Sequence, residues 1–513
     1  MSAIPLFLAA GAAVDMARVS REQIAFADAV DSAALAVAAS DRSNLDGLTG
    51  AALQARKDEL KAYATTYILK NYTPQFHNNT AIAVSLDITN TLVTLGASHD
   101  YPMTIMKLAG IQDFTLYANS EVTRNSTNLE VAVTLDATGS MGGQKIIDLR
   151  AAANELVDLV VQDVQTPTYS KMALAPYSMG VNAGAYAPQV RGAIAPMKAM
   201  TGATRANPVV VTSNAHGFAN GNIVYIIGVS GMTQINNIAF RVANSTANTF
   251  ALTSATTGSN INGTSYGSYT SGGSISCTTP GCQYYSFLNP SGNRRTYQVS
   301  TCVTERTGAH TYTEAAPSTA FVGRNYASTG MPCINATITP LETNKTTLHA
   351  TVNSLVAAGS TAGHIGVTWA RYMLAPDFGY LWPAASQPAA YGTPNLLKVA
   401  IIMTDGLFNS PYCNGVVAQN ATSGAPPTND RINCNATNGN SYTQAQTHCD
   451  AMKAIGVIVY TVGFALGSDQ NAIDFMNNCA TDAAHVYLPQ NGGALSAAFQ
   501  AIAAEVNALR ISK

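Results

Sequence analysis

The sequence predicts an α/β fold: a doubly wound, mainly parallel sheet with an inserted small all-β barrel module, preceded by a long N-terminal helix and a short β region. Two observations carry this prediction. Near-continuous apolar runs alternate with helical stretches over residues 129–199 and 341–513, which is typical of parallel strands buried on both faces. Between them, residues 200–276 contain only short β runs separated by Gly and Asn turns, and this pattern predicts a separate all-β unit.

Length and composition bound the classes of function. At 513 residues the chain is long enough for two or three domains, each with its own core. Only 11% of its residues are charged, well under the roughly 25% of an ordinary soluble domain. The 27 basic and 29 acidic residues nearly balance, and no basic run is present that would bind a phosphate backbone. We therefore expect no nucleic-acid partner.

Residues 1–70 are predicted to be a helical, pilin-like region that anchors the chain to a membrane. Ala3 to Val14 is apolar and uncharged, and charged residues begin at Asp15. A spanning helix needs about 20 apolar residues, so the run inserts partially, continues upstream of Met1, or packs against other apolar helices as pilin helices do. A cleaved signal peptide is the alternative, but no basic segment precedes the run.

The remaining elements follow from hydrophobic periodicity. A period of two in 81–88 and 113–122 predicts a small β region over 71–128. Buried strands are predicted at Leu129–Leu135, Lys171–Ser178, Leu397–Gly406 and Gly456–Phe464, and helices at Lys145–Val164, Thr343–Ala357 and Ser441–Ile455. Residues 277–340 are predicted to be a loop-rich, cysteine-bearing link between the inserted module and the second part of the α/β domain.

The cysteines indicate an oxidising compartment. The chain has eight, all in its second half, and none lies in a CxxC pair, which gives a structural zinc site little support. An even count favours disulfides, and buried free thiols in a cytosolic protein are the alternative. The connectivity does not follow from the sequence, but proximity favours Cys277 with Cys282, Cys302 with Cys333, Cys413 with Cys434, and Cys449 with Cys479.

Three loops carry the candidate site. Asp136, Thr138 and Ser140 form a D-x-T-x-S sequence after a buried strand, AAGSTAGHIG at 357–366 precedes a helix, and MTDG at 403–406 ends another strand. The carboxyl ends of neighbouring strands converge in a doubly wound sheet, so the three loops can meet. All their ligand atoms are oxygens, which suits a hard divalent cation and not zinc or copper. We expect Mg²⁺, with Mn²⁺ or Ca²⁺ as alternatives.

These loops resemble the metal-ion-dependent adhesion site of von Willebrand factor A domains. LDATGSM, GST at 359–361 and TDG at 404–406 occur in that family's order. The resemblance implies five metal ligands, direct or through water: Asp136, Thr138, Ser140, Thr361 and Asp405. It also implies an open coordination position for a partner's carboxylate. The two Asp residues would balance the cation, leaving a neutral site that does not repel this acidic ligand.

The chain also resembles the TadG-like proteins of tight-adherence (Flp/Tad) pilus systems. The residues that carry this resemblance are VDMARVSREQIAFADAVDSAALAVA near the start, GSTAGHIGVTWARYMLAPDFGYLWP, KVAIIMTDGLFN, and ALSAAFQAIAAEVNALRIS at the end. It implies a non-enzymatic protein of the bacterial envelope, membrane-anchored and extracytoplasmic, with pilus subunits or assembly components as partners. The insert, with VVVTSNAHGF and GVSGMTQINNIAFRV, resembles the small non-catalytic barrel of ubiquitin-activating enzymes and of phage or bacterial surface proteins.

Other readings remain open at this point. Asp136 could be the nucleophile of a haloacid-dehalogenase-like phosphate-transferring enzyme, but Thr138 stands where soluble members need a second carboxylate. Asp136 and Asp405 could cap helices in a purely structural, minor-pilin-like scaffold. A cytosolic chelatase-type ATPase partner has a similar metal site, but the apolar N-terminus and the cysteines count against it. His216 is interpreted as a turn residue, and His364 as a residue that at most flanks the metal ligands.

Overall fold

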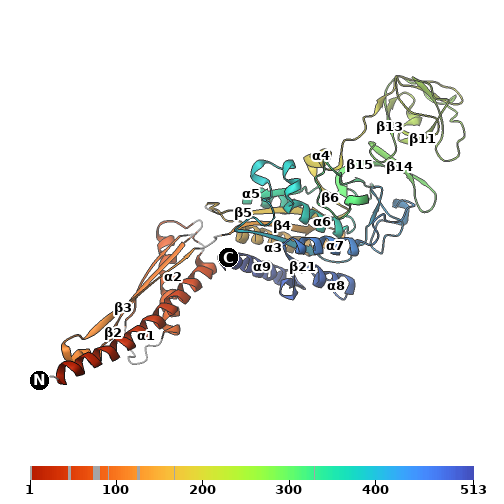
Figure 1. Cartoon of the computed structure of the whole chain (residues 1–513). Helices are drawn as coiled ribbons and strands as arrows, with labels where there is room; N and C mark the ends of the chain where they lie inside the picture. Colours follow the sequence, from red (N-terminus) through yellow and green to blue (C-terminus); the bar gives the residue numbers. More distant parts are fainter. Residues whose placement is uncertain are drawn as a thin grey trace.

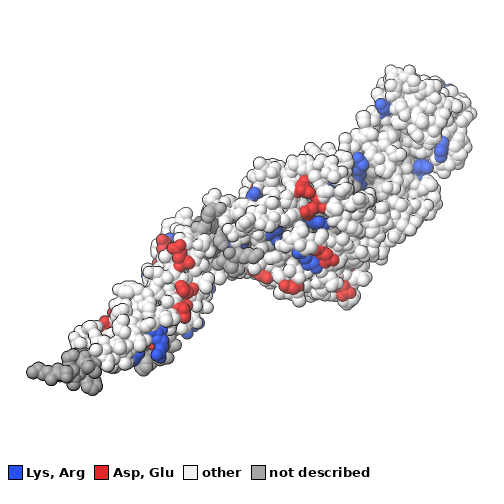
Figure 2. Space-filling model, in the orientation of Figure 1, with Lys and Arg blue, Asp and Glu red and all other residues white. Residues whose placement is uncertain are grey.

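The computed structural model describes residues 3–512, except 44, 46, 47, 73–80, 90, 91, 124–126, 167 and 329; for residues 3–8, 41, 511 and 512 it describes the backbone only. The described chain is elongated (Figure 1). An N-terminal unit of helices and a small β-sheet is followed by a central α/β unit. The inserted β module lies at the end of the molecule opposite the N-terminus. Figure 2 shows that charged side chains are sparse on the visible face of all three parts.

The N-terminal unit has its own core. Helices α1 (Ala3–Ala39) and α2 (Gly50–Asn71) pack with an antiparallel sheet of order β1-β2-β3. Its strands are β1 (Ala83–Ile88), β2 (Leu92–Pro102) and β3 (Asp113–Thr123). Helix α1 buries Phe26 in this core, followed by smaller apolar side chains from Ala29 to Val37. Strand β2 was not predicted, because Gly96, His99 and Asp100 interrupt its hydrophobic alternation.

Two acidic side chains that end the apolar run of α1 are buried in this unit. Asp15 is 2% exposed, and its Oδ2 accepts hydrogen bonds from the backbone N–H groups of Thr104, Ile105 and Met106. Glu22 accepts a hydrogen bond from the Tyr72 hydroxyl at 3.1 Å. These carboxylates therefore fix α1 to the loops and helix beside it. No helix in the described part of the chain is long and apolar enough to cross a membrane.

The central unit is built on a ten-stranded sheet. Its main path is β14-β15-β6-β5-β4-β18-β21-β22, with β16 beside β15 and β17 beside β5. The bounds are β14 (Tyr284–Leu288), β15 (Arg294–Thr304), β6 (Val181–Asn182), β5 (Ser170–Tyr177), β4 (Asn128–Asp136), β18 (Leu396–Thr404), β21 (Ile458–Gly463), β22 (Val486–Tyr487), β16 (Gly323–Tyr326) and β17 (Thr339–Glu342). The five strands from β5 to β22 on this path are parallel. The mixed α/β fold with a parallel sheet is therefore confirmed.

Helices cover both faces of this sheet. One face packs against α3 (Gln144–Val160), α5 (Lys345–Asn353) and α9 (Gly492–Ser512), and the other against α6 (Gly363–Leu374), α7 (Ser441–Ala454) and α8 (Gln470–Cys479). The short elements α4 (Ala187–Arg191), β19 (Tyr412–Cys413) and β20 (Val416–Val417) complete the unit. Two apolar cores result, one on each face, which explains why β4 and β18 are apolar almost throughout.

The segment 277–340 differs from its prediction as a loop-rich link. It contributes four strands: β14 and β15 form a hairpin, β15 pairs with β6 and β16, and β17 pairs with β5. The partners β5 and β6 lie far back in the sequence. Pairing with distant strands stabilises these elements, and local periodicity cannot reveal it.

The inserted module is a seven-stranded sheet of order β7-β13-β10-β11-β12-β9-β8. Its strands are β7 (Lys198–Ala199), β8 (Gly202–Ala203), β9 (Val210–Thr212), β10 (Ile223–Ser230), β11 (Ile238–Ala243), β12 (Thr249–Ser254) and β13 (Ser271–Cys277). The edge strands β7 and β8 are consecutive in sequence. Met200 N–H donates to Gly273 at one edge and Thr201 N–H to Thr212 at the other. One short segment therefore joins both edges and closes the sheet.

All eight cysteines are paired in the four disulfides that sequence proximity favoured. Cys449 of α7 is bonded to Cys479 at the end of α8, so two helices on one face of the central sheet are joined covalently. Closing a loop of this size stabilises a fold by about 3 kcal/mol in the chain-entropy account. The disulfides are those of a protein of an oxidising, extracytoplasmic compartment.

Candidate metal centre

The predicted loops meet at the carboxyl ends of β4 and β18. Strand β4 ends at Asp136, and Asp405 follows the last residue of β18. The third loop is held to the first by two backbone hydrogen bonds, from Gly139 N–H to Gly359 and from Ala358 N–H to Ala137, both 2.9 Å long. Gly359 has a φ of +79°, and a Cβ there would lie 2.9 Å from Met179. Glycine therefore suits this left-handed backbone, and a side chain at this position would displace Met179.

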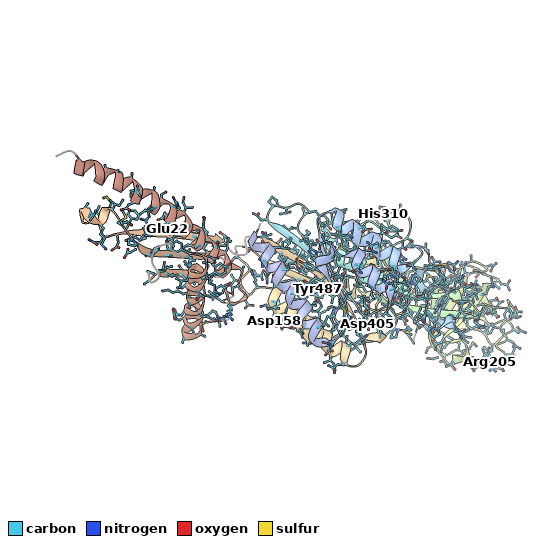
Figure 3. All side chains as sticks on the ribbon, turned by 90° about the horizontal axis from the view of Figure 1, so that it is seen from below. Glu22, Asp158, Arg205, His310, Asp405 and Tyr487 are labelled. Atoms are coloured by element: carbon cyan, nitrogen blue, oxygen red, sulfur yellow. A yellow bond between two sulfur atoms is a disulfide. The ribbon has the colours of Figure 1, made fainter. Side chains whose placement is uncertain are left out.

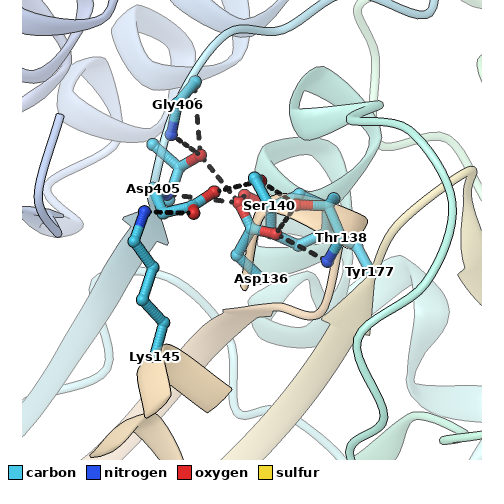
Figure 4. A network of polar contacts seen from close by, with 8 residues as sticks. Asp136, Thr138, Ser140, Lys145, Tyr177, Asp405 and Gly406 are labelled. Carbon is cyan, nitrogen blue, oxygen red and sulfur yellow. Dashed lines mark hydrogen bonds and ion pairs between the residues drawn. The ribbon is translucent and has the colours of Figure 1, made fainter. Parts of the chain in front are cut away.

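Four of the five predicted ligands form one polar network (Figure 4). Asp136 Oδ1 accepts hydrogen bonds from the backbone N–H of Thr138 at 2.9 Å and from its hydroxyl at 2.6 Å. The hydroxyls of Thr138 and Ser140 are 2.9 Å apart, and Ser140 Oγ donates to Asp405 Oδ1 at 2.6 Å. Asp136 and Thr138 are fully buried, whereas Ser140 is exposed. The network therefore reaches solvent at Ser140.

The second oxygen of Asp136 is held by residues that the sequence analysis did not identify. Its Oδ2 accepts hydrogen bonds from the Tyr177 hydroxyl at 2.9 Å and the Thr404 hydroxyl at 2.8 Å. Burial, and then the charge of Asp405, raises the pKa of Asp136 to about 6, although the hydrogen bonds from Thr138 and Thr404 oppose this shift. Thr404 directly precedes Asp405 in the sequence, so its position was a usable signal. Tyr177 is brought in by the neighbouring strand β5.

Lys145 is an unpredicted cation at the site. Its Nζ lies 2.8 Å from Asp405 Oδ2, and its side chain is 32% exposed, while that of Asp405 is fully buried. Ser140 and Lys145 therefore bind different oxygens of the same carboxylate. When both acids are ionised, the group formed by Asp136, Asp405 and Lys145 carries one negative charge in excess.

The fifth predicted ligand, Thr361, lies beside the network but is not part of it. Thr361 is 5% exposed, and its backbone exchanges two hydrogen bonds of 3.0 Å with Asn409: Thr361 N–H donates to Oδ1, and Asn409 N–H donates to the Thr361 carbonyl. No hydrogen bond among the described residues joins its hydroxyl to Asp136, Thr138 or Ser140. Its loop reaches the site through Gly359 instead.

The two histidines considered in the sequence make their hydrogen bonds to residues outside the network. His364 Nε2 pairs with Glu305 Oε2 at 2.5 Å inside the core, so its ring is committed to a contact within the fold. His216 Nδ1 accepts the Phe218 N–H at 3.0 Å within the inserted module, in agreement with a turn role.

The donor set fits a hard cation. It consists of carboxylate and hydroxyl oxygens, and Ser178, which the ideal Cβ of Gly359 would contact, has a buried hydroxyl with no hydrogen-bond partner. The described residues contain no group of three or more His, Cys, Asp or Glu side chains that could hold a metal. Helix α3 begins after Gly143 without a side-chain cap, so Asp136 does not serve the helix-capping role that a pure scaffold would give it.

Comparisons with known proteins add one family match. Residues 206–278 match the family described as the ubiquitin-activating enzyme E1 FCCH domain, which is the resemblance proposed for the insert. A search of curated proteins finds no match.

Solved structures similar to this chain include several pilus proteins. The vWF domain of the type V pili tip protein Mfa5 from Porphyromonas gingivalis is 12% identical with a TM-score of 0.34, over 75% of this chain and 97% of that one. The pilus adhesin SpaC from Lactobacillus rhamnosus GG is 11% identical with a TM-score of 0.32, over 85% and 35%. Proximal thread matrix protein 1 from the mussel byssus, with a zinc-occupied MIDAS motif, is 12% identical with a TM-score of 0.29, over 74% and 47%. TM-scores this low support no inference about this chain.

Proposed function

We propose that this chain is a non-enzymatic, extracytoplasmic protein of a tight-adherence (Flp/Tad) pilus system whose central unit is a von Willebrand factor A domain. It binds a divalent cation, Mg²⁺ before Mn²⁺ or Ca²⁺, at a metal-ion-dependent adhesion site. The ligands are Asp136, Thr138, Ser140, Thr361 and Asp405. One observation carries this proposal: two buried carboxylates from neighbouring parallel strands face the same pair of hydroxyls, in a loop that opens to solvent.

The residues of the chain prepare the site for a cation. Tyr177 and Thr404 hold one oxygen of Asp136, and Lys145 holds one oxygen of Asp405. The oxygens that remain, together with the hydroxyls of Thr138 and Ser140, can exchange their mutual hydrogen bonds for a metal. A bound cation supplies positive charge and an open coordination position. The hydrogen bonds from Tyr177 and Thr404 and the ion pair with Lys145 restrict the two carboxylates before a cation binds. Little side-chain entropy is therefore lost on binding.

Lys145 changes the charge expected for the loaded site. The two carboxylates alone predict a neutral site, but with Lys145 the same group has one negative charge without the cation and one positive charge with it. Binding therefore reverses the sign of the local charge. A carboxylate on a protein partner is repelled by the metal-free site and attracted by the loaded one. We propose an acidic partner for this reason, either a pilus subunit or an assembly component.

The location proposed for the chain is the bacterial envelope. Four disulfides support an oxidising compartment, and the N-terminal helix is proposed to attach the chain to the membrane. The phosphate-transferring alternative has less support, because both oxygens of Asp136 accept hydrogen bonds and the residue is fully buried. A nucleophile needs an accessible oxygen.

Calorimetry tests the metal proposal. Wild type is expected to bind Mg²⁺ and Mn²⁺, and Asp136→Ala is expected to lose this response while remaining folded. Asp113→Ala removes an exposed carboxylate from β3 and serves as the matched control. Equal heats of binding for wild type and Asp136→Ala would leave the purely structural scaffold as the better interpretation.

A further inference from the structure

Two arginines lie together where the inserted module is attached to the central unit. Arg191 ends α4, just before the chain enters the module, and Arg324 is in β16. The entering and leaving segments touch, because Ala195 N–H donates to Gly281 at 2.9 Å. Arg324 Nη2 donates to the Ala193 carbonyl at 3.4 Å, and its side chain also approaches Gly281. The Arg324 guanidinium therefore belongs to this junction, and a Cβ at Gly192, the residue after Arg191, would lie 3.1 Å from its Nη2.

Neither arginine has an acidic partner among the described residues. Arg191 is 7% exposed, and its Nε and Nη1 have no hydrogen-bond partner. The Nε of Arg324 is likewise buried without a partner. Burial, followed by the charge of Arg324, lowers the pKa of Arg191. Glu305 is the acidic residue of the nearby cavity, but its carboxylate binds His364 and the backbone N–H of Tyr412.

This arrangement is electrostatically incomplete. A guanidinium does not lose its proton in a protein, and burying an unpaired charge costs several kcal/mol. Arg191 is the buried member of the pair, and the positive charge of the partly buried Arg324 adds repulsion. Arg324 lines a cavity of about 200 Å³, together with Thr304, Thr307 and Phe321. The cavity is large enough for a small ion, so a counter-charge can reach the Arg324 side of the pair from solvent.

We propose that a small inorganic anion binds between the guanidinium groups of Arg191 and Arg324. A halide or an oxyanion such as sulfate has the required charge, and the guanidinium fork suits an oxyanion especially well. The anion connects α4 with β16 beside the two segments that carry the module. It therefore stabilises the attachment of the module, independently of the cation site.

Anomalous diffraction from crystals of the full chain in sodium bromide locates the ion directly. We expect a bromide peak in contact with both guanidinium groups, and we expect sulfate to displace it when added in excess. Retention of the bromide peak in sulfate would assign the site to halides alone, which is still the proposed anion site. Crystals with no peak between Arg191 and Arg324 would overturn the proposal.

Thermal unfolding at constant ionic strength provides a second readout. Chloride or sulfate should raise the unfolding midpoint of wild type by about 2 °C or more over gluconate, which is a bulkier organic anion. Arg191→Met should lose this difference. Arg205→Met should keep it, because Arg205 lies in the module (Figure 3) and its Nη2 donates to the Thr264 carbonyl. If Arg191→Met does not fold, Arg324→Met replaces it. Equal midpoints of wild type in all three salts would contradict the proposal.

Discussion

Buried charged side chains lie at both ends of the β4–β18 strand pair, but they are compensated at one end and not at the other. At the amino ends, Glu130 and Lys398 are register partners, and Lys398 Nζ lies 2.5 Å from Glu130 Oε2. Lys398 also donates to Leu374, and Glu130 accepts from Ala389. At the carboxyl ends, Asp136 and Asp405 are both acidic, and Lys145 supplies only one positive charge. The charges at the first end balance, and the second end keeps one negative charge in excess when both acids are ionised.

This difference separates a structural charge from a binding site. A buried ion pair whose remaining hydrogen bonds are made needs no ligand. A buried pair of like charges is stable only when protonated or when an ion from outside binds. The Arg191–Arg324 pair is the basic counterpart of the acidic pair, because we propose an anion beside the two guanidinium groups and a cation between Asp136 and Asp405. Uncompensated charge therefore marks both proposed ion sites.

Removing the charge of Lys398 from the Glu130–Lys398 ion pair should have the largest effect on stability. Lys398→Met leaves Glu130 buried and unpaired, so the free energy of unfolding should fall by about 3–5 kcal/mol. Urea denaturation with and without Mg²⁺ measures it. The Mg²⁺-dependent increase in stability should be unchanged, because the cation site lies at the other end of the strands. Loss of that increase in Lys398→Met would show that the two ends are not independent.

Neutralising Asp136 at the acidic end of the strand pair should change the pH dependence of stability. Burial and the charge of Asp405 raise the pKa of Asp136 in the folded protein to about 6, from the usual 3.8 of an aspartate. As pH rises from about 4 to 6, the unfolded state ionises first, so metal-free wild type loses about 3 kcal/mol from this group. Asp136→Asn should lack that loss. Urea denaturation of both proteins in EDTA at pH 4 and pH 7 checks this prediction. If the free energy of unfolding changes by the same amount between the two pH values in wild type and in Asp136→Asn, the prediction is wrong.

Removing the charge of Lys145 should increase the excess of negative charge at the acidic end of the strand pair. In Lys145→Met the metal-free site has two uncompensated negative charges, so Mg²⁺ should bind more tightly by about 1 kcal/mol, a modest effect because Lys145 is partly exposed. The loaded site becomes neutral, so an acidic partner should bind more weakly. Calorimetry with Mg²⁺ checks the first effect. Weaker Mg²⁺ binding would mean that Lys145 positions Asp405 rather than competing for it.

The smallest effect is expected at Thr361. Thr361→Ala removes one neutral oxygen and no charge, so it should weaken Mg²⁺ binding by about 1 kcal/mol or less, where Asp136→Ala abolishes it. Thr422→Ala, in the exposed loop nearby, is the control. If Thr361→Ala binds as wild type does, Thr361 is not a ligand and the site consists of the four networked residues.

The sequence predicted those parts of the molecule that depend on local pattern. The strands leading to Asp136 and Asp405, the helices between them and the four cysteine pairs follow from periodicity and proximity. The strands β15 and β17 did not, since β6 and β5, with which they pair, are distant in sequence. Lys145 and the Arg191–Arg324 pair were also missed. The Lys145–Asp405 and Arg191–Arg324 interactions each join residues more than 100 positions apart. Local sequence patterns do not predict which charged side chains will lie together over such a separation.

Anomalous diffraction from crystals soaked in Mn²⁺ tests the central claim, that the acidic end of the strand pair is a cation site. A manganese peak is expected beside the hydroxyls of Thr138 and Ser140 in wild type, and it should be absent from Asp136→Ala. No peak should occur at Glu130 and Lys398, where the charges already balance. Wild-type crystals without manganese between Asp136 and Asp405 would contradict the claim.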